Sequence, residues 1–230
     1  MTSKIVYLGH SGFLIRSGNY SLVIDPYLTG NPLAAMETRD ITADYVILTH
    51  GHSDHLGDGI EIARNNDATL IAPYELAMFC QFHDVKNVHP MHIGGSYQFP
   101  FGTLKLTLAA HGSAVIEGTT ITYTGNPCGL LLFLEKKILY HAGDTGIFYD
   151  MRLIGEMHSI DLALLPIGGN FTMDVADAVK AVELLNPKLS VPMHYNTFGL
   201  IKADPGDFVA RCEQKGFNAR ILDIGAMLEL

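Results

Sequence analysis

The chain has 230 residues, of which 48% are hydrophobic and 17% are charged, and its formal net charge is −9. This composition is typical of a globular protein with a well-buried core, and it excludes a largely disordered chain. The negative net charge argues against a surface that collects nucleic acid electrostatically.

The cysteines and the apolar segments indicate where the protein works. Cys80, Cys128 and Cys212 are widely spaced and form no C-x-x-C pair, so we expect a reducing compartment and no disulfide framework. Residues 1–10 lack the long apolar core of a secretion signal. The longest apolar run, Leu130–Leu134, is too short to cross a bilayer. We therefore predict a cytoplasmic protein without a membrane partner.

The chain begins with a predicted meander of three strands, Lys4–Leu8, Gly12–Arg16 and Tyr20–Ile24. His10 lies in the first turn, either as a surface residue or as a residue that supports a site or contacts substrate. Asp25 follows the third strand, where it either accepts a hydrogen bond from a metal-binding histidine or simply forms a turn.

A dense group of metal-binding side chains follows the next predicted strand, Asp44–Leu48. The sequence T-H-G-H-S-D-H runs from Thr49 to His55, and a helix is expected over Leu56–Arg64. Loops at the carboxyl ends of strands are where open sheets hold their sites. A loop tight enough to need Gly51 would aim two of these groups at one ion and two at a neighbouring ion. The four groups are His50, His52, Asp54 and His55.

The middle of the chain continues with alternating strands and one helix. We predict strands at Thr69–Ala72, Tyr97–Phe99 and Thr103–Leu108, and a helix over Pro73–Phe82. The histidines of this region are scattered among loop residues without nearby carboxylates, so we interpret them as structural or surface residues; they are His83, His89 and His92.

Three further candidate ligands each follow a predicted strand. His111 comes after Thr103–Leu108, and small residues follow it. Asp144 comes shortly after the strand Lys137–Tyr140, and His194 directly follows the strand Leu189–Met193. His141 is expected to orient the Asp144 loop rather than bind metal. Tyr195 and Asn196, which directly follow His194, are candidates for hydrogen bonds to substrate.

The remaining elements complete a single predicted domain over residues 1–230. We expect strands at Leu130–Leu134, Ile160–Pro166, Arg220–Ile224 and Ala226–Leu230, and helices at Met173–Leu185 and Pro205–Lys215. The segment Ile138–His141 resembles Ile47–His50, because each is a buried strand that ends in histidine. This similarity suggests two related halves, roughly 1–112 and 113–230.

Seven candidate ligands are too many for one zinc ion in an open catalytic site. They suit two ions, with His50, His52 and His111 at one, Asp54, His55 and His194 at the other, and Asp144 between them. Histidine and carboxylate ligands fit zinc, manganese or iron, and zinc is favoured at equal supply. Such a pair ionises a bridging water near neutral pH, which predicts a hydrolytic nucleophile. Asp54 or Asp144 would move the proton.

These motifs resemble the metallo-β-lactamase superfamily, whose H-x-H-x-D-H motif matches His50 to His55, and whose later ligands match His111, Asp144 and His194. The phrases "LGHSGFLI", "IDPYLTGNP", "HAGDTGIF" and "PMHYNTF" resemble a family of metal-dependent hydrolases within it. That family is akin to the ascorbate-6-phosphate lactonase and N-acyl-phosphatidylethanolamine phospholipase D branches. The resemblance implies an α/β fold, an αββα sandwich of two mixed sheets with helices on both outer faces and the site at one edge.

The expected activity is hydrolysis of an ester, lactone or related bond in a small cytoplasmic metabolite. Two alternatives remain open: a phosphodiesterase or nuclease that uses the same metal pair, and a metal-binding protein without catalysis. We expect a small-molecule partner and no nucleic acid, and we leave open whether the chain forms a homo-oligomer.

Overall fold

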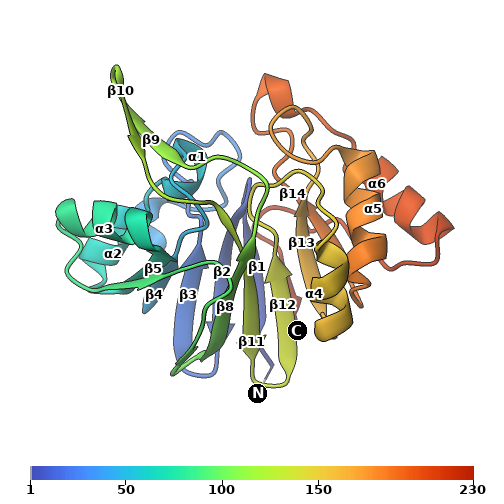
Figure 1. Ribbon diagram of the computed structural model, residues 1–230, viewed down its shortest axis with the longest axis horizontal. Coiled ribbons are helices and arrows are strands. Elements are labelled where there is room, and N and C mark those ends of the chain that lie inside the picture. The colour runs from blue at the N-terminus through green and yellow to red at the C-terminus, as the bar shows by residue number, and fades with distance from the viewer. Residues whose placement is uncertain (1) are drawn as a thin grey trace.

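Two mixed β-sheets lie face to face at the centre of the chain, and helices cover their outer faces (Figure 1). The computed structural model describes residues 2–230. Across the first sheet the strands are β15 (Met227–Glu229), β1 (Lys4–Gly9), β2 (Gly12–Ser17), β3 (Tyr20–Ile24), β4 (Tyr45–Ile47), β5 (Thr69–Pro73) and β6 (Val88–Met91). Across the second they are β14 (Ser190–Met193), β13 (Leu162–Pro166), β12 (Lys137–His141), β11 (Cys128–Leu134), β8 (Gly102–Leu108) and β7 (Ser96–Phe99).

Each sheet changes from antiparallel to parallel pairing. In the first sheet β1, β2 and β3 pair antiparallel, and β3, β4, β5 and β6 pair parallel. In the second sheet β11 and β12 pair antiparallel, and β12, β13 and β14 pair parallel. Parallel strands end at the same edge of a sheet, so the loops that follow β4, β12 and β14 can meet at one edge of the sandwich.

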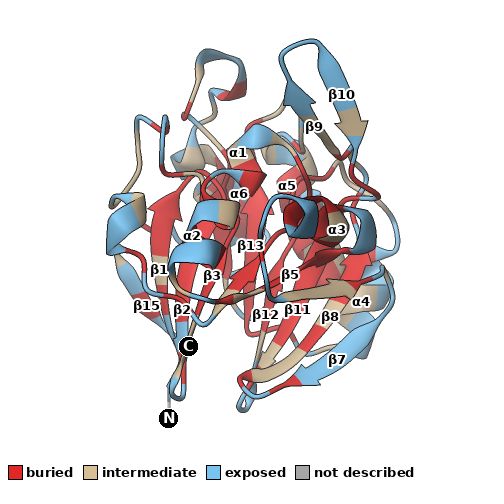
Figure 2. Ribbon diagram, turned by 90° about the vertical axis from the view of Figure 1, so that its left-hand side faces the viewer, coloured by how far each residue is buried: buried red, intermediate tan, exposed pale blue. Residues whose placement is uncertain are grey.

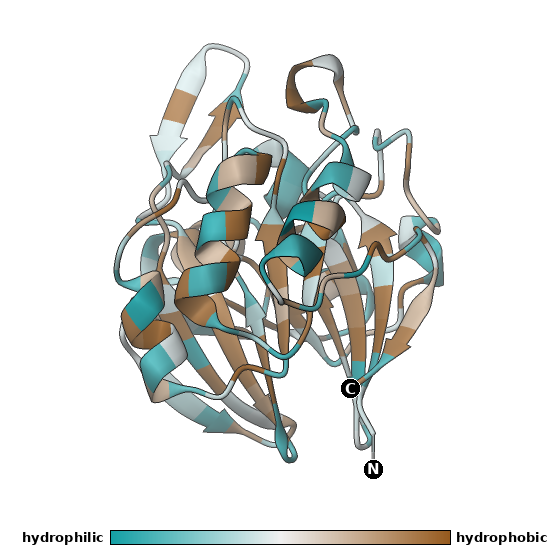
Figure 3. Cartoon of the chain, turned by 90° about the vertical axis from the view of Figure 1, so that its right-hand side faces the viewer, coloured by the Kyte–Doolittle hydropathy of each residue, from teal (hydrophilic) through white to brown (hydrophobic). Residues whose placement is uncertain are grey.

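Helices form the two outer layers. α2 (Gly59–Asn65) and α3 (Tyr74–Phe82) cover the first sheet, and α4 (Met151–Met157), α5 (Val175–Leu185) and α6 (Pro205–Gln214) cover the second. Most of the strand residues between the layers are buried (Figure 2), and the helices that face the viewer in Figure 3 carry separate apolar and polar faces. The order of layers is therefore helix, sheet, sheet, helix, as the resemblance implies.

The core has one compartment between the sheets and one beneath each helical layer. Ile5, Phe13 and Ile24 of the first sheet share the central compartment with Leu130 and Leu164 of the second. Burial of this much apolar surface is the main force that holds two sheets together. The side chains that face the edge with the loops are polar instead, which leaves that edge free for a site.

α5 shows why the sequence forms these elements. The carboxylate of Asp174 accepts a hydrogen bond from the backbone N–H of Asp177 and so caps the first turn. Ala178, Val182 and Leu185 share a helix face and are buried against the second sheet. The helix ends at Asn186, whose φ of 47° is left-handed, a common way for helices to stop.

Several sequence-based predictions need correction. No strand forms over Arg220–Ile224 within the described residues, because the pairing with β14 is limited to an isolated bridge between Ser190 and the preceding Ala219, next to which the Arg220 N–H donates to the Ser190 carbonyl. The helix expected over Leu56–Arg64 is split into α1 (Ser53–Leu56) and α2, because Gly57 has a φ of 41° and a Cβ there would overlap the backbone of Pro26. The sequence patterns also gave no indication of β6, α4 or the hairpin of β9 (Ala114–Glu117) and β10 (Thr120–Tyr123), nor of the short helices η1 (Thr38–Asp40) and η2 (Gly199–Ile201).

The proposed division into halves at residue 112 stays a prediction. β7 and β8 precede this boundary but belong to the second sheet, and β15 follows it but belongs to the first. In residues 2–230, none of the helices has the length and apolar character needed to cross a membrane.

Candidate metal centre

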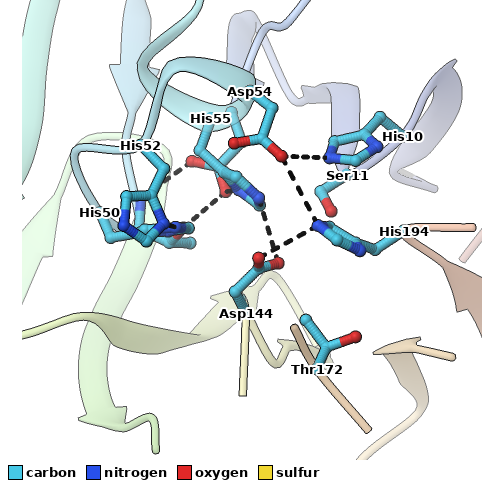
Figure 4. Close-up of polar contacts among 12 residues, drawn as sticks. His10, Ser11, His50, His52, Asp54, His55, Asp144, Thr172 and His194 are labelled. Atoms are coloured by element: carbon cyan, nitrogen blue, oxygen red, sulfur yellow. Dashed lines mark hydrogen bonds and ion pairs between the residues drawn. The ribbon is translucent and has the colours of Figure 1, made fainter. Parts of the chain in front are cut away.

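The seven predicted ligands all come from loops or helix starts that follow strands. They gather at the edge of the sandwich where the parallel strands of both sheets end, and Figure 4 shows most of them pointing toward one another. His50 and His52 follow β4, Asp54 and His55 lie in α1, His111 follows β8, Asp144 follows β12, and His194 follows β14.

The tight H-x-H loop depends on Gly51. A Cβ at this position would overlap the side chain of Thr124, which lies at the base of the β9–β10 hairpin. The backbone N–H of Gly51 also donates a hydrogen bond to the hydroxyl of Ser113, at 3.1 Å. The hairpin base therefore holds the loop from outside, and any larger residue at position 51 would move both histidines.

His50, His52 and His111 form the first cluster, in which ring nitrogens lie within 4.8 Å of one another. His50 Nε2 is 3.0 Å from His52 Nδ1, and His111 Nε2 is 3.3 Å from the same Nδ1. Ligands about 2.0–2.1 Å from a tetrahedral zinc ion lie roughly 3.3 Å from one another. The spacing of these three nitrogens therefore fits a shared ion.

Asp54, His55 and His194 form the second cluster. His194 Nε2 lies 3.8 Å from Asp54 Oδ2, and all three side chains offer ligand atoms to one small volume. His55 and His194 are almost fully buried, whereas His52 and His111 of the first cluster are partly exposed. The second cluster is thus deeper and has a carboxylate that the first cluster lacks.

Asp144 reaches both clusters, and its Oδ1 lies 3.1 Å from His55 Nε2. Its Oδ2 is 3.1 Å from His194 Nε2 and 3.6 Å from His111 Nε2. One carboxylate therefore faces ligands of both clusters, which is the position that the sequence predicted for it.

Buried atoms without hydrogen bonds show that the site suits cations. His55 Nε2, His194 Nε2 and Asp144 Oδ1 are fully buried and make no well-aligned hydrogen bond, although nitrogen and oxygen are close. Buried polar atoms are rarely left unpaired, because their desolvation is costly. A divalent ion among these atoms would satisfy them, so the residues present fit a metal centre.

The pKa values in this region point the same way. Burial opposes protonation of His55, but Asp144 and Asp25 outweigh it and hold the pKa of His55 well above its usual range. Burial also opposes protonation of His194, yet Asp144 raises its pKa to about 9. By contrast, burial and the neighbouring His55 hold the pKa of His50 well below 6.5. In the metal-free site, protons on His55 and His194 therefore balance the negative charge of the nearby carboxylates.

Asp25 supports ligands of both clusters. Its Oδ2 accepts hydrogen bonds from His55 Nδ1 at 2.7 Å and from the Thr49 hydroxyl at 2.6 Å. The Thr49 oxygen lies 3.0 Å from His50 Nδ1, so it can in turn accept a hydrogen bond from that ring. These hydrogen bonds would orient the Nε2 atoms of His50 and His55 toward a bound metal ion, which is the usual role of such supporting contacts. Of the two roles left open for Asp25, the structure shows the hydrogen bond to a histidine of the cluster.

His10 lies beside the second cluster rather than on the surface. Its Nε2 is 3.1 Å from Asp54 Oδ2, and its Nδ1 is 2.8 Å from the Thr197 hydroxyl. Burial lowers the pKa of His10 to about 4, even though Asp54 favours the charged form. His10 is therefore a neutral ring that donates to Asp54. The backbone N–H of His194 also donates to the His10 carbonyl at 2.7 Å, so the two turns hold each other in place.

The Asp144 loop is fixed by residues on either side of it. His141 Nδ1 accepts from the backbone N–H of Gly143, and its Nε2 donates to the Ser11 carbonyl at 3.0 Å, which confirms the predicted orienting role. Thr145 accepts from the backbone N–H of Ala110 at 2.9 Å and so ties this loop to the one that carries His111. Sequence patterns do not reveal the Thr145 contact, because the two segments are far apart in the chain.

Other predicted residues lie outside the cluster. Among the residues that the structure describes, neither Tyr195 nor Asn196 lines the cavity over the ligands. Tyr195 packs toward the second helical layer, and the side chain of Asn196 accepts from the backbone of Ala203. The three histidines treated as structural contact aromatic rings outside the clusters: His83 stacks on Phe79 and His92 on Tyr74, and His89 contacts Tyr97 with its ring tilted.

The four-layer fold and the His/Asp clusters at the strand ends define a hydrolase of the metallo-β-lactamase type. The family model described as "Beta-lactamase superfamily domain" matches residues 4–194. The chain belongs to this superfamily, and it is a metal-dependent hydrolase with a His/Asp metal-binding cluster.

Relatives and solved structures agree with this assignment. A UPF0173 metal-dependent hydrolase from Carboxydothermus hydrogenoformans is 51% identical over 227 residues, covering 99% of this chain and 100% of the relative. A Bacillus cereus protein of the same name is 49% identical over 229 residues, with the same coverage. The structure of Igni18, a metallo hydrolase from Ignicoccus hospitalis, has a TM-score of 0.88 at 36% identity and covers 100% of this chain and 99% of its own.

Proposed function

We propose that the chain hydrolyses an ester, lactone or related bond in a small molecule, with a hydroxide generated between two divalent metal ions. The observation that carries this proposal is the position of Asp144, whose oxygens face His111 of the first cluster and His55 and His194 of the second. A carboxylate between two ligand sets offsets the repulsion of two nearby cations. Zinc is the expected metal, and manganese or iron would also suit these ligands.

When bound, two such ions lower the pKa of a shared water and polarise the scissile bond. The chain supplies the ligands and the route for the proton. Asp54 lines the cavity and its side chain is 23% exposed, whereas that of Asp144 is 3% exposed. Asp54 is therefore better placed to pass a proton to a leaving group, and the hydrogen bond from His10 fixes its orientation. Asp144 stays between the clusters.

A substrate screen with metal analysis tests the proposal. Wild-type protein, reloaded with zinc or manganese, would be assayed on ester, lactone, thioester and phosphodiester panels, with His50→Ala as the control for contaminating activity. We expect close to two ions per chain and hydrolysis of an ester or lactone by the wild type alone. A stoichiometry at or below one ion after reloading would contradict the two-ion site.

The same screen separates the alternatives. Cleavage of bis-p-nitrophenyl phosphate without any action on esters or lactones would identify a phosphodiesterase instead. Two tightly bound ions without hydrolysis of any substrate in the panels would favour a metal-binding protein without catalysis.

A further inference from the structure

The cavity over the metal ligands has a wall that the hydrolytic chemistry does not require. It has a volume of about 320 Å³, which is at the small end of the range for ligand sites. Candidate ligands and Ser53 form its floor, and three aromatic rings form the rest of its lining: Tyr27, Phe171 and Phe198.

These rings are exposed enough to receive a ligand. The side chain of Phe171 is 47% exposed, and Tyr27 and Phe198 are partly exposed. Aromatic residues that border a concave site are a frequent source of binding energy, because a ligand removes their surface from water. Their convergence on one cavity from three segments differs from the scattered single hydrophobic residues that every surface carries.

The rings are also held in place by the residues that position the metal ligands. Tyr27 and Phe198 both pack against His10, with ring centroids 5.7 and 5.6 Å away. The Tyr27 hydroxyl donates to the Gly30 carbonyl at 3.0 Å, so its polar group already has a partner. Thr197, which precedes Phe198 in the chain, forms a hydrogen bond with His10. This part of the wall is thus fixed before any ligand arrives.

Phe171 reaches the cavity from the other side. It lies in the turn between β13 and α5, where Thr172 N–H donates to the Gly169 carbonyl at 3.0 Å. Met173 N–H donates to the Thr145 carbonyl at 2.9 Å, which joins the turn to the residue after Asp144. Figure 4 shows Thr172 on the side of the site where Asp144 and His194 lie. The ring of Phe171 is therefore tied to the centre through a short backbone link.

The charges around the cavity limit what can lie against these rings. In the described part of the chain, no lysine or arginine lines the cavity, and apart from Tyr27 its ionisable lining residues are the candidate ligands themselves. A phosphate or carboxylate that lies against the rings, away from the scissile bond and the metal ligands, would find no cationic side chain there, and removing it from water would be costly. An uncharged apolar group would instead cover the aromatic surface.

We propose that the substrate carries an uncharged, ring-sized apolar group next to its scissile bond, and that Tyr27, Phe171 and Phe198 bind this group. The inference rests on the proposed function for the identity of the bond, but the binding of the group is tested separately. The small volume leaves room for about one ring beside the reacting group. The site thereby selects against substrates with a second anionic group.

Binding of matched metal chelators tests this inference without turnover. The probes are acetohydroxamic acid, phenylacetohydroxamic acid and its 4-carboxyphenyl analogue, titrated by calorimetry into zinc-loaded protein. All three place the same chelating group on the metal, so the ratio of their Kd values isolates the contribution of the ring. We expect the phenyl compound to bind at least about tenfold more tightly than the methyl compound, because a ring is buried. The carboxyphenyl compound should lose most of this gain.

Variants of the wall connect the preference to the named rings. Phe171→Ala combined with Phe198→Ala should reduce the phenyl-to-methyl ratio to within about threefold, because the phenyl probe loses the aromatic surface that it covers. Phe82→Ala is the matched control, because Phe82 is 80% exposed at the end of α3 and does not line the cavity. Phe82→Ala should keep the phenyl-to-methyl ratio of the wild type. If this control lost as much of the ratio as the double variant does, the assignment of the preference to the aromatic wall would be overturned.

Three further results would overturn the inference: equal Kd values for the methyl and phenyl probes, tighter binding of the carboxyphenyl probe, or a ratio that survives in the double variant. Failure of both neutral hydroxamates to bind would also overturn it. A clear ring preference in a protein that hydrolyses no ester or lactone would support the aromatic wall and contradict the proposed function. The two proposals therefore fail in different ways.

Discussion

The two ligand clusters differ in charge, depth and support. The first cluster consists of three histidines, two of them partly exposed, whereas the second holds Asp54 and two buried histidines. His10 forms a hydrogen bond with a residue of the second cluster alone. Asp25 supports both clusters, because it bonds directly to His55 of the second cluster and through Thr49 to His50 of the first. The second cluster thus joins a partly exposed carboxylate to two buried histidines, and the first offers neutral rings nearer to solvent.

This difference suggests separate tasks for the clusters. A carboxylate next to buried ligands attracts a cation more strongly than neutral rings do, because it is charged and the low local dielectric strengthens the attraction. Neutral imidazoles at a more open position leave room for exchange of water or substrate. We therefore expect the second cluster to hold its ion more firmly and the first to take the larger part in contact with substrate. Asp144 couples them, so its loss should disturb both.

The largest effect is expected for Asp144→Asn. The substitution keeps the shape of the side chain but removes the charge that faces both clusters at 3.1–3.6 Å. Turnover should fall on the order of 100-fold or more, and the pH optimum should rise because the bound water ionises less readily. A pH–rate profile with metal analysis and thermal unfolding measures this. Unchanged turnover with two tightly held ions would remove Asp144 from the centre.

A smaller loss, still shared by both clusters, is expected for Asp25→Asn. Asn tolerates the left-handed φ of 42° at this position but cannot accept all three hydrogen bonds that Asp25 receives. Metal affinity should fall about 10–100-fold at both sites, as measured by competition with a chelator. Asp161→Asn is the matched control, because Asp161 is also a buried carboxylate but bonds to Ile138 and Lys188 away from the metal site. Loss of affinity at only one site would contradict the shared role of Asp25.

The acid sensitivity of metal binding should distinguish the clusters. In the metal-free protein His194 has a pKa of about 9 and keeps its proton below that pH, whereas the pKa of His50 is lowered and its ring is neutral at pH 7. An ion in the second cluster must displace protons, so its apparent affinity should rise about tenfold per pH unit for each proton displaced, up to about pH 9. Zinc titrations of His111→Ala and His194→Ala, which spare the second and first clusters respectively, give the comparison. Equal pH slopes in the two variants would refute the asymmetry.

The sequence predicted which side chains meet at one edge of the sandwich, because their placement follows from chain direction, and their role as metal ligands stays a prediction. His50, Asp144 and His194 each come after a buried strand, and parallel strands deliver such residues to one edge whatever the details of packing. Asp25 also follows a predicted strand, which makes it a candidate for supporting the site. The sequence leaves open whether it accepts a hydrogen bond from a histidine or only forms a turn. The structure resolves this, since only the fold brings His55 beside it.

Features that depend on contacts between distant segments could not be predicted. Tyr27, Phe171 and Phe198 come from three loops with no shared motif, so nothing in the sequence indicates that they meet in one cavity. The β9–β10 hairpin was missed because Ile116 and Ile121, which pair across its strands, are both exposed instead of alternating with buried residues. The strand expected over Arg220–Ile224 has suitable residues but lacks a partner strand along its length.

The smallest expected effect, confined to the second cluster, is that of His10→Ala. His10 donates to Asp54 at 3.1 Å and is itself held by Thr197, so its removal frees Asp54 without removing a ligand. Both ions should remain, and turnover should fall by about tenfold, the lower end of what such supporting hydrogen bonds contribute. Thr197→Val, which removes only the outer hydrogen bond, should cost less than His10→Ala. Turnover, metal content and thermal unfolding of both variants would be compared.

Because His10 also lies within ligand distance of the second cluster, loss of an ion in His10→Ala would show that it binds metal. Retention of both ions with lowered turnover would show instead that the more buried cluster depends on a neutral histidine to aim its carboxylate.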